Sequence, residues 1–146
     1  MFQVKHRNNG ECQYCVEIRD KFPNFNNELW IWFSDTQKII PDFHISCAGR
    51  GQIDQEMLYM KGASRAHWTM SAHNWGAALD TFFMCDLNNL WPTKRYAALS
   101  LGIPTTINWY GKIGSTFPEL PHFELKNWRI LRDQGDLRLC ETPSIK

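Results

Sequence analysis

The sequence contains no long hydrophobic run and no leader-like N-terminus. Its longest aromatic and aliphatic stretch is LWIWF at 29–33, far shorter than the roughly 20 apolar residues of a membrane-spanning helix. The first residues, MFQVKHRNNGECQ, lack the apolar segment of a cleaved secretion signal. We therefore expect no membrane insertion and synthesis in the cytoplasm without a signal peptide.

The sequence also lacks an excess of either charge. Sixteen Lys and Arg residues stand against 15 Asp and Glu residues, for a formal net charge of +1 over 146 residues. Such a balance gives no reason to expect nucleic acid or an anionic membrane as the main partner. With 43% hydrophobic and 21% charged residues, the chain has the composition of a globular protein, and its length suits a single domain over 1–146.

Cysteines are few and form no disulfide pattern. The five cysteines are an odd number, and in a reducing compartment they predict no disulfide framework. Cys12 and Cys15 have the C-x-x-C spacing of a zinc knuckle or a redox pair, but no second C-x-x-C follows, and structural zinc normally takes four Cys or His ligands. We interpret the two as free thiols, with a structural metal or redox role as the alternative.

The predicted secondary structure mixes helices and strands without a regular strand-helix-strand rhythm. Hydrophobic spacing predicts three helices, at 26–40, 52–62 and 92–102, and three strands, at 42–49, 76–84 and 122–126. Asn27 is the expected N-cap of the first helix. Phe43, Ile45 and Cys47 are expected to share one face of the first strand. This order of elements favours an α+β domain over a doubly wound one.

The segment SAHNWGAALD, residues 71–80, places a histidine and an aspartate seven positions apart. In an extended strand His73 and Asp80 would lie about 23 Å apart, and along a helix about 10 Å apart, so neither regular element lets them share a metal ion. A turn at 74–76, with Gly76 free to adopt a positive φ, returns His73 over the strand that carries Asp80. The segment therefore predicts a metal site built on a turn.

A third candidate ligand lies in FPELPHFEL, residues 117–125. Alternation along the predicted strand places His122 and Glu124 on one face. A catalytic zinc takes three protein ligands and leaves one position open. Glu119, three residues before His122, offers a carboxylate that need not bind the metal and could accept a proton from metal-bound water.

Three blocks of the sequence resemble one family of zinc peptidases. The signature S-x-H-x-x-G-x-A-x-D of the D-alanyl-D-alanine carboxypeptidase and L-alanyl-D-glutamate peptidase family matches Ser71, His73, Gly76, Ala78 and Asp80. The block CAGRGQIDQEMLYMKG is similar to a family block whose members here are Arg50, Gln55, Tyr59 and Gly62. The closing PHFEL resembles the segment that supplies the last histidine of the family. The resemblance covers about residues 43–126 and is closest to L-alanyl-D-glutamate endopeptidases used as phage endolysins.

This resemblance implies a fold of the hedgehog and D-Ala-D-Ala peptidase type, with a small antiparallel sheet flanked by helices. It implies one catalytic Zn²⁺ bound by His73, Asp80 and His122. Glu119 would then be the general base.

The same resemblance implies roles for three further residues. Arg50 would polarise the scissile carbonyl or stabilise the oxyanion, a role that suits a planar cation with several donors. Ser71 and Gln55 would hold the substrate or the site loop by hydrogen bonds.

We therefore expect a zinc-dependent peptidase that hydrolyses the stem peptides of peptidoglycan, acting as an endolysin in host lysis. Its partner would be a peptidoglycan peptide at the cell wall, reached from the host cytoplasm with the help of a separate holin. Two alternatives stay open: a D-alanyl-D-alanine carboxypeptidase or dipeptidase, and a non-catalytic zinc-containing module that binds the cell wall or a virion protein.

Overall fold

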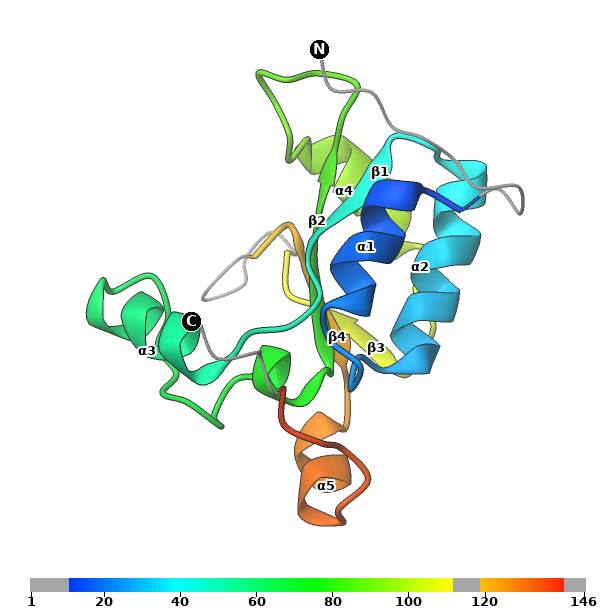
Figure 1. Cartoon of the computed structure of the whole chain (residues 1–146). Coiled ribbons are helices and arrows are strands. Elements are labelled where there is room, and N and C mark those ends of the chain that lie inside the picture. The colour runs from blue at the N-terminus through cyan, green and yellow to red at the C-terminus, as the bar shows by residue number, and fades with distance from the viewer. Residues whose placement is uncertain (1–10, 112–118, 141–146) are drawn as a thin grey trace.

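A four-stranded antiparallel sheet forms the centre of the molecule (Figure 1). The computed structural model describes residues 11–111 and 119–140. Within these ranges the strands are β1 (Phe43–Cys47), β2 (Ala78–Phe83), β3 (Ile107–Trp109) and β4 (His122–Leu125). They lie in the order β1-β2-β4-β3, and every neighbouring pair is antiparallel.

Helices flank this sheet. The described residues form α1 (Gln13–Asp20), α2 (Asn27–Ile39), α3 (Gln52–Met60), the 3₁₀ helix η1 (Ala72–Trp75), α4 (Thr93–Ser100) and α5 (Trp128–Asp133). In Figure 1, α1 and α2 lie together on one side of the sheet, and α3 lies on the other side. The predicted α+β class, with a small antiparallel sheet and flanking helices, is confirmed. Among the described helices, none is long and apolar enough to cross a membrane.

The hydrophobic core lies between α2 and one face of the sheet. Phe43, Phe83 and Phe123 extend from three different strands into this layer and are fully buried. Phe33 of α2 packs on Phe43 with ring centroids 5.3 Å apart. Burial of a side chain of this size stabilises the fold by roughly 1.5–3 kcal/mol. Because alternate residues of a strand point to opposite faces, the core residues leave the other face of the sheet for polar side chains.

All six elements predicted from the sequence are present, each within its predicted range. The predicted cap of α2 is wrong by one residue. Asn26, and not Asn27, is the N-cap, and its side chain accepts a hydrogen bond from the Leu29 N–H at 3.1 Å. Asn27 is already the first helical residue, so its side chain is too far along the helix to cap it.

Helix α1 was not predicted, and it covers the outer edge of β1. Only a short stretch of the helix is apolar, and its N-cap residue Cys12 makes no capping hydrogen bond through its side chain. Cys15 and Val16 are buried, and the Ile45 N–H of β1 donates to Cys15 Sγ at 3.5 Å. An isolated helix of eight residues is marginal in water, so contact with the strand edge, rather than a local sequence signal, stabilises α1.

A bulge near the end of β1 changes the side of the sheet on which Cys47 lies. Ile45 pairs with Thr81 of β2, but the next pair is Cys47 with Asp80, so one residue of β1 is skipped. Residues directly opposite one another in a ladder share a face. The prediction that Cys47 shares the core face of Phe43 and Ile45 is therefore wrong, because strict alternation ignores the bulge.

The turn predicted at 74–76 is present, as the end of η1. Gly76 closes this helix with φ of 66°, as the predicted positive φ requires. Two distant segments hold the turn: the Asn26 N–H donates to the Gly76 carbonyl at 2.9 Å, and the Cys140 N–H donates to the Asn74 carbonyl at 2.6 Å. The turn is therefore fixed from both the N-terminal and the C-terminal parts of the described chain.

Replacing Gly76 by alanine should destabilise the protein strongly. A Cβ atom there would come closer to the Asn24 carbonyl oxygen than van der Waals contact allows. Together with the strain of a positive φ, this should cost roughly 2–4 kcal/mol of unfolding free energy. Gly135→Ala is the control, because Gly135 has a similar φ of 79° and an added Cβ would meet nothing within 4 Å. Urea denaturation of both variants gives the comparison, and equal losses would show that Asn24 does not constrain the turn.

Candidate active site

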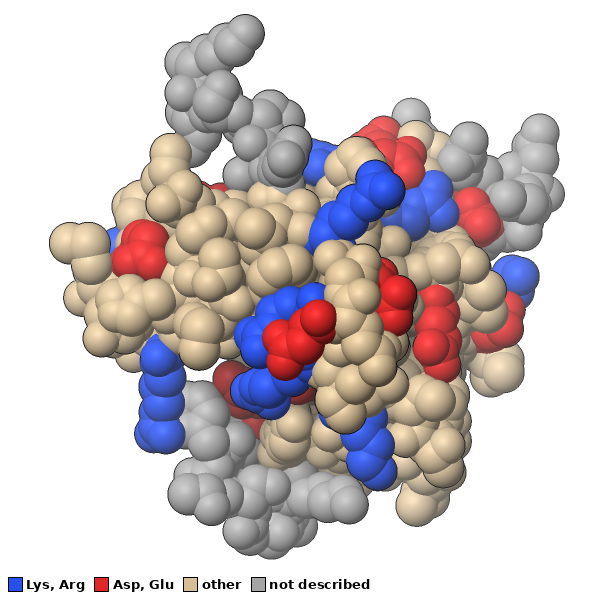
Figure 2. Space-filling view, turned by 90° about the horizontal axis from the view of Figure 1, so that it is seen from below, with Lys and Arg blue, Asp and Glu red and all other residues tan. Residues whose placement is uncertain are grey.

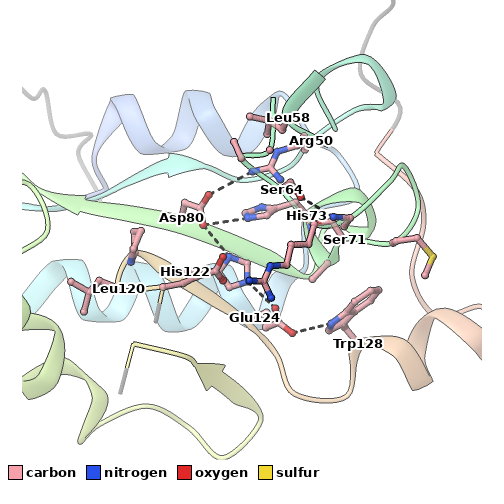
Figure 3. Close-up of a pocket in the computed structure, with 18 of the residues that line it drawn as sticks. Arg50, Leu58, Ser64, Ser71, His73, Asp80, Leu120, His122, Glu124 and Trp128 are labelled. Atoms are coloured by element: carbon pink, nitrogen blue, oxygen red, sulfur yellow. Dashed lines mark hydrogen bonds and ion pairs between the residues drawn. The ribbon is translucent and has the colours of Figure 1, made fainter. Parts of the chain in front are cut away.

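The three predicted metal ligands meet around one carboxylate oxygen. Asp80 of β2 lies directly opposite His122 of β4 in the sheet, and His122 Nδ1 is 3.0 Å from Asp80 Oδ1. Helix η1, which ends in the turn at Gly76, brings His73 Nε2 to 3.2 Å from the same oxygen (Figure 3). The structure thus brings together residues that are 7 and 42 positions apart, on the face of the sheet opposite the core.

The second ring nitrogen of His122 is held by Glu124. His122 Nε2 lies 2.7 Å from Glu124 Oε1. The other oxygen, Oε2, accepts hydrogen bonds from Trp128 Nε1 at 2.9 Å and from the Tyr110 hydroxyl at 3.4 Å. Glu124 is only 9% exposed. A carboxylate behind a ligating imidazole fixes the orientation of the ring, so the contacts of Glu124 fit a positioning role.

The second ring nitrogen of His73 faces Cys47. Cys47 Sγ lies 3.8 Å from His73 Nδ1 and donates a hydrogen bond to the Gly49 carbonyl at 3.1 Å. The bulge in β1 makes this contact possible, and no sequence pattern signals it. Among the described residues, one ligand atom from each of Cys47, His73 and Asp80 lies within 4.8 Å of the others, and His122 is not part of this group. We interpret Cys47 as the group that orients His73, because His73 Nε2 is the nitrogen that faces Asp80.

Charge is strongly coupled within this group. Burial alone would raise the pKa of the Asp80 carboxyl, but the charge of His73 and hydrogen bonds from both histidines lower that pKa below its ordinary value. Burial would lower the pKa of His73 and of His122. The pKa of His73 is raised instead by the charge of Asp80 beside it. The pKa of His122 is raised by the hydrogen bonds that it donates to Asp80 and Glu124. These shifts all favour positive charge beside Asp80, the condition under which a cation can replace protons at a binding site.

The donor set fits a zinc ion. Two imidazole nitrogens and one carboxylate oxygen are ligands that Zn²⁺ takes in catalytic sites, where one position stays open to water or substrate. His73, Asp80 and His122 all line a cavity of about 850 Å³. A cation bound between them would therefore be reached from the cavity.

Arg50 approaches the same group from the loop between β1 and α3. Its Nη2 lies 3.8 Å from Asp80 Oδ2, and its Nη1 donates to Gln55 Oε1 at 3.2 Å. The side chain lines the cavity. The structure thus places the predicted Arg50 beside Asp80, with Gln55 supporting its guanidinium group.

Gln55 and Ser71 hold loops through contacts within the protein. Gln55 is fully buried, and its Nε2 donates to Ser64 Oγ at 3.0 Å and to the Ala66 carbonyl at 2.6 Å. Ser71 Oγ accepts a hydrogen bond from the His73 N–H at 3.3 Å, which caps η1. Of the two roles that the resemblance implies, substrate binding and loop support, these contacts fit loop support. Ser71 also lines the cavity.

Asn74 is a central residue of the site that the sequence reasoning missed. It is fully buried, and its Oδ1 accepts from the N–H groups of Thr69 and Ser71, at 3.1 and 3.2 Å. Its Nδ2 donates to the Arg50 carbonyl at 3.0 Å and to Gln55 Oε1 at 3.2 Å. The signal in the sequence was an asparagine directly beside His73 in a turn, since asparagine side chains often bond to nearby backbone.

Glu119 lines the cavity near the ligands. Its carbonyl accepts a hydrogen bond from the His122 N–H at 3.4 Å, so it stands at the entry to β4. The residues 112–118, which precede it in the segment that resembles the family, lie outside the described residues.

On the face shown in Figure 2, acidic and basic side chains are interspersed, with acidic atoms recessed beneath basic ones near the centre. The cavity lining has this mixed charge too: Arg50, Arg65, Arg129, Asp80, Glu119 and Glu124.

Comparison with known proteins supports the fold. No family model matches the sequence, and no curated protein is similar to it in sequence. The structure is similar to the crystal structure of the L-Ala D-Glu endopeptidase ChiX of Serratia marcescens, with a TM-score of 0.58 over 82% of this chain and 91% of that one. At 20% sequence identity, this likeness establishes that the two chains share a fold.

Proposed function

We propose that the protein is a zinc-dependent peptidase that hydrolyses peptidoglycan stem peptides, as an L-alanyl-D-glutamate endopeptidase of the kind that phage endolysins use. The observation that carries the proposal is the convergence of His73, Asp80 and His122 around Asp80 Oδ1 at the wall of an open cavity. The fold shared with an L-Ala D-Glu endopeptidase and the three sequence blocks support the same function.

Proton transfer is the role we assign to Glu119. A zinc ion held by His73, Asp80 and His122 would supply a Lewis acid for the scissile carbonyl and a water of lowered pKa. Glu119 lines the same cavity, where its carboxylate would accept the proton of the attacking water and deliver it to the leaving amine. Glu124 is less suited to this role because both of its oxygens already have partners.

Arg50 is the group that we assign to the developing negative charge. A guanidinium group carries a positive charge and presents several donors in one plane. Hydrogen bonding to Gln55 holds it beside Asp80 before a substrate arrives. A donor that is already in place when charge develops lowers the barrier more than one that must move.

Three arginines in the mixed-charge lining of the cavity offer partners for the carboxylates of a peptide. Arg50, Arg65 and Arg129 all line the cavity, and stem peptides of peptidoglycan carry several carboxylates. If the protein acts as an endolysin, it meets this substrate at the cell wall, with a holin opening the route from the cytoplasm. The peptide would lie across the ligands between these arginines.

Digestion of defined peptidoglycan tests the function directly. We expect products that end in L-alanine, with matching peptides that begin at D-glutamate, detected by mass spectrometry. A chelator should abolish the reaction and added zinc should restore it, because the ligands leave a position for water. Released D-alanine would instead identify a carboxypeptidase. If zinc-loaded protein gave no product at all, the remaining alternative would be the non-catalytic module that binds the cell wall or a virion protein.

Asp80→Ala should remove one equivalent of zinc along with activity. Loss of a ligand should weaken binding by more than the roughly 10–100-fold typical of losing a residue that only orients a ligand. Asp133→Ala is the control, since Asp133 is exposed at the end of α5. Zinc content by atomic absorption and turnover are measured on both proteins. Wild-type zinc affinity in Asp80→Ala would mean that another residue binds the metal.

Glu119→Gln should separate proton transfer from metal binding. We expect this variant to keep its fold and its zinc while turnover falls about 10²–10⁴-fold, the range for loss of a general base. Glu124→Gln is the matched variant and should weaken zinc binding, with a smaller loss of turnover at saturating zinc. The reverse pattern would make Glu124 the base.

A further inference from the structure

A second group of potential metal ligands lies at the outer edge of β1, away from the cavity. Cys12 Sγ and Cys15 Sγ lie 3.6 and 3.5 Å from His44 Nδ1. One ligand atom from each of the three residues lies within 4.8 Å of the others. Both cysteines are 0% exposed and His44 is 1% exposed. No disulfide links any of the five cysteines of the chain, all of which lie in the described residues.

We propose that Cys12, Cys15 and His44 bind a structural zinc ion that fastens α1 to the sheet, separate from the catalytic ion. The distances carry this assignment. Tetrahedral zinc with Zn–S of about 2.3 Å and Zn–N of about 2.0–2.1 Å places a sulfur and a nitrogen ligand about 3.6 Å apart. The observed S–N distances of 3.5 and 3.6 Å match the two sulfur–nitrogen edges expected for such a tetrahedron.

Burial raises the pKa of the Cys15 thiol to about 12, but two hydrogen-bond donors face its sulfur, as they would face a metal-bound thiolate. Its sulfur accepts from the Ile45 N–H at 3.5 Å and from Gln37 Nε2 at 3.4 Å. Gln37 is itself fixed by donating to the Phe43 carbonyl at 2.8 Å. Donors of this kind orient a ligand and stabilise its negative charge.

A redox role fits these cysteines less well. Reactive cysteine pairs are at least partly accessible, since a partner thiol must reach the sulfur, whereas neither Cys12 nor Cys15 has exposed surface. A structural ion also accounts for α1, an eight-residue helix without a side-chain cap at its start. The cluster contributes three of the four ligands that a structural zinc normally takes. A zinc site here replaces the interpretation of the pair as free thiols and does not rest on the proposed peptidase function.

Cobalt substitution tests the site by a signal that only sulfur ligands give. Thiolate bound to Co²⁺ absorbs in the near ultraviolet by charge transfer. We expect this band in the wild-type protein and in Asp80→Ala, and its loss in Cys12→Ser and in Cys15→Ser. Cys47→Ser and Cys85→Ser are the controls, because Cys47 lies beside His73 and Cys85 is exposed, and both should keep the band.

Zinc X-ray absorption of Asp80→Ala answers the question without a cysteine variant, which could fail to fold. This protein should retain one zinc with two sulfur neighbours at about 2.3 Å. Retained zinc without sulfur neighbours, no retained zinc in the folded protein, or a Cys12–Cys15 disulfide in the purified protein would overturn the proposal. A band that survives in Cys15→Ser and disappears in Cys47→Ser would do so too. Loss of peptidase activity with the sulfur signal intact would count against the proposed function alone.

Discussion

The register between β2 and β4 is the constraint on which the candidate site depends. It places Asp80 directly opposite His122 and, one position along, Leu79 opposite Phe123. A slip of one residue would exchange the faces and put the carboxylate into the core. Because Leu79 and Phe123 are fully buried, such a slip would expose them. The packing of the apolar face therefore fixes the geometry of the polar face, where His73 completes the group.

The preorganisation of the site comes from one buried amide. Asn74 bonds to the loop that carries Arg50, to Gln55 of α3 and to the backbone before His73. The two histidines are each held at the ring nitrogen that faces away from Asp80, by Cys47 and by Glu124 respectively. Groups that are locked in this way need little rearrangement when charge develops in a reaction.

The sequence predicted what local patterns control. Hydrophobic periodicity predicted six elements. The turn at Gly76 was predictable because neither a strand nor a helix would bring His73 close enough to Asp80 to share a metal ion, and Gly76 can adopt the positive φ that a turn needs. The sequence could not predict the bulge that turns Cys47 toward His73, since a bulge depends on the partner strand. Helix α1 was missed because its stability comes from the edge of β1. The partners of Glu124 were missed because Trp128 and Tyr110 reach it only in the folded chain.

The contact between the Cys140 N–H and the Asn74 carbonyl affects the order in which the parts of the site are completed as the chain is synthesised. His73, Asp80 and His122 all leave the ribosome before Cys140 does, so the ligands exist in the nascent chain while the turn still lacks its last support. The Cys140 thiol also donates to the His73 carbonyl at 3.1 Å. The position of His73 therefore depends on a segment that is synthesised after all three ligands and after the strands that carry the other two.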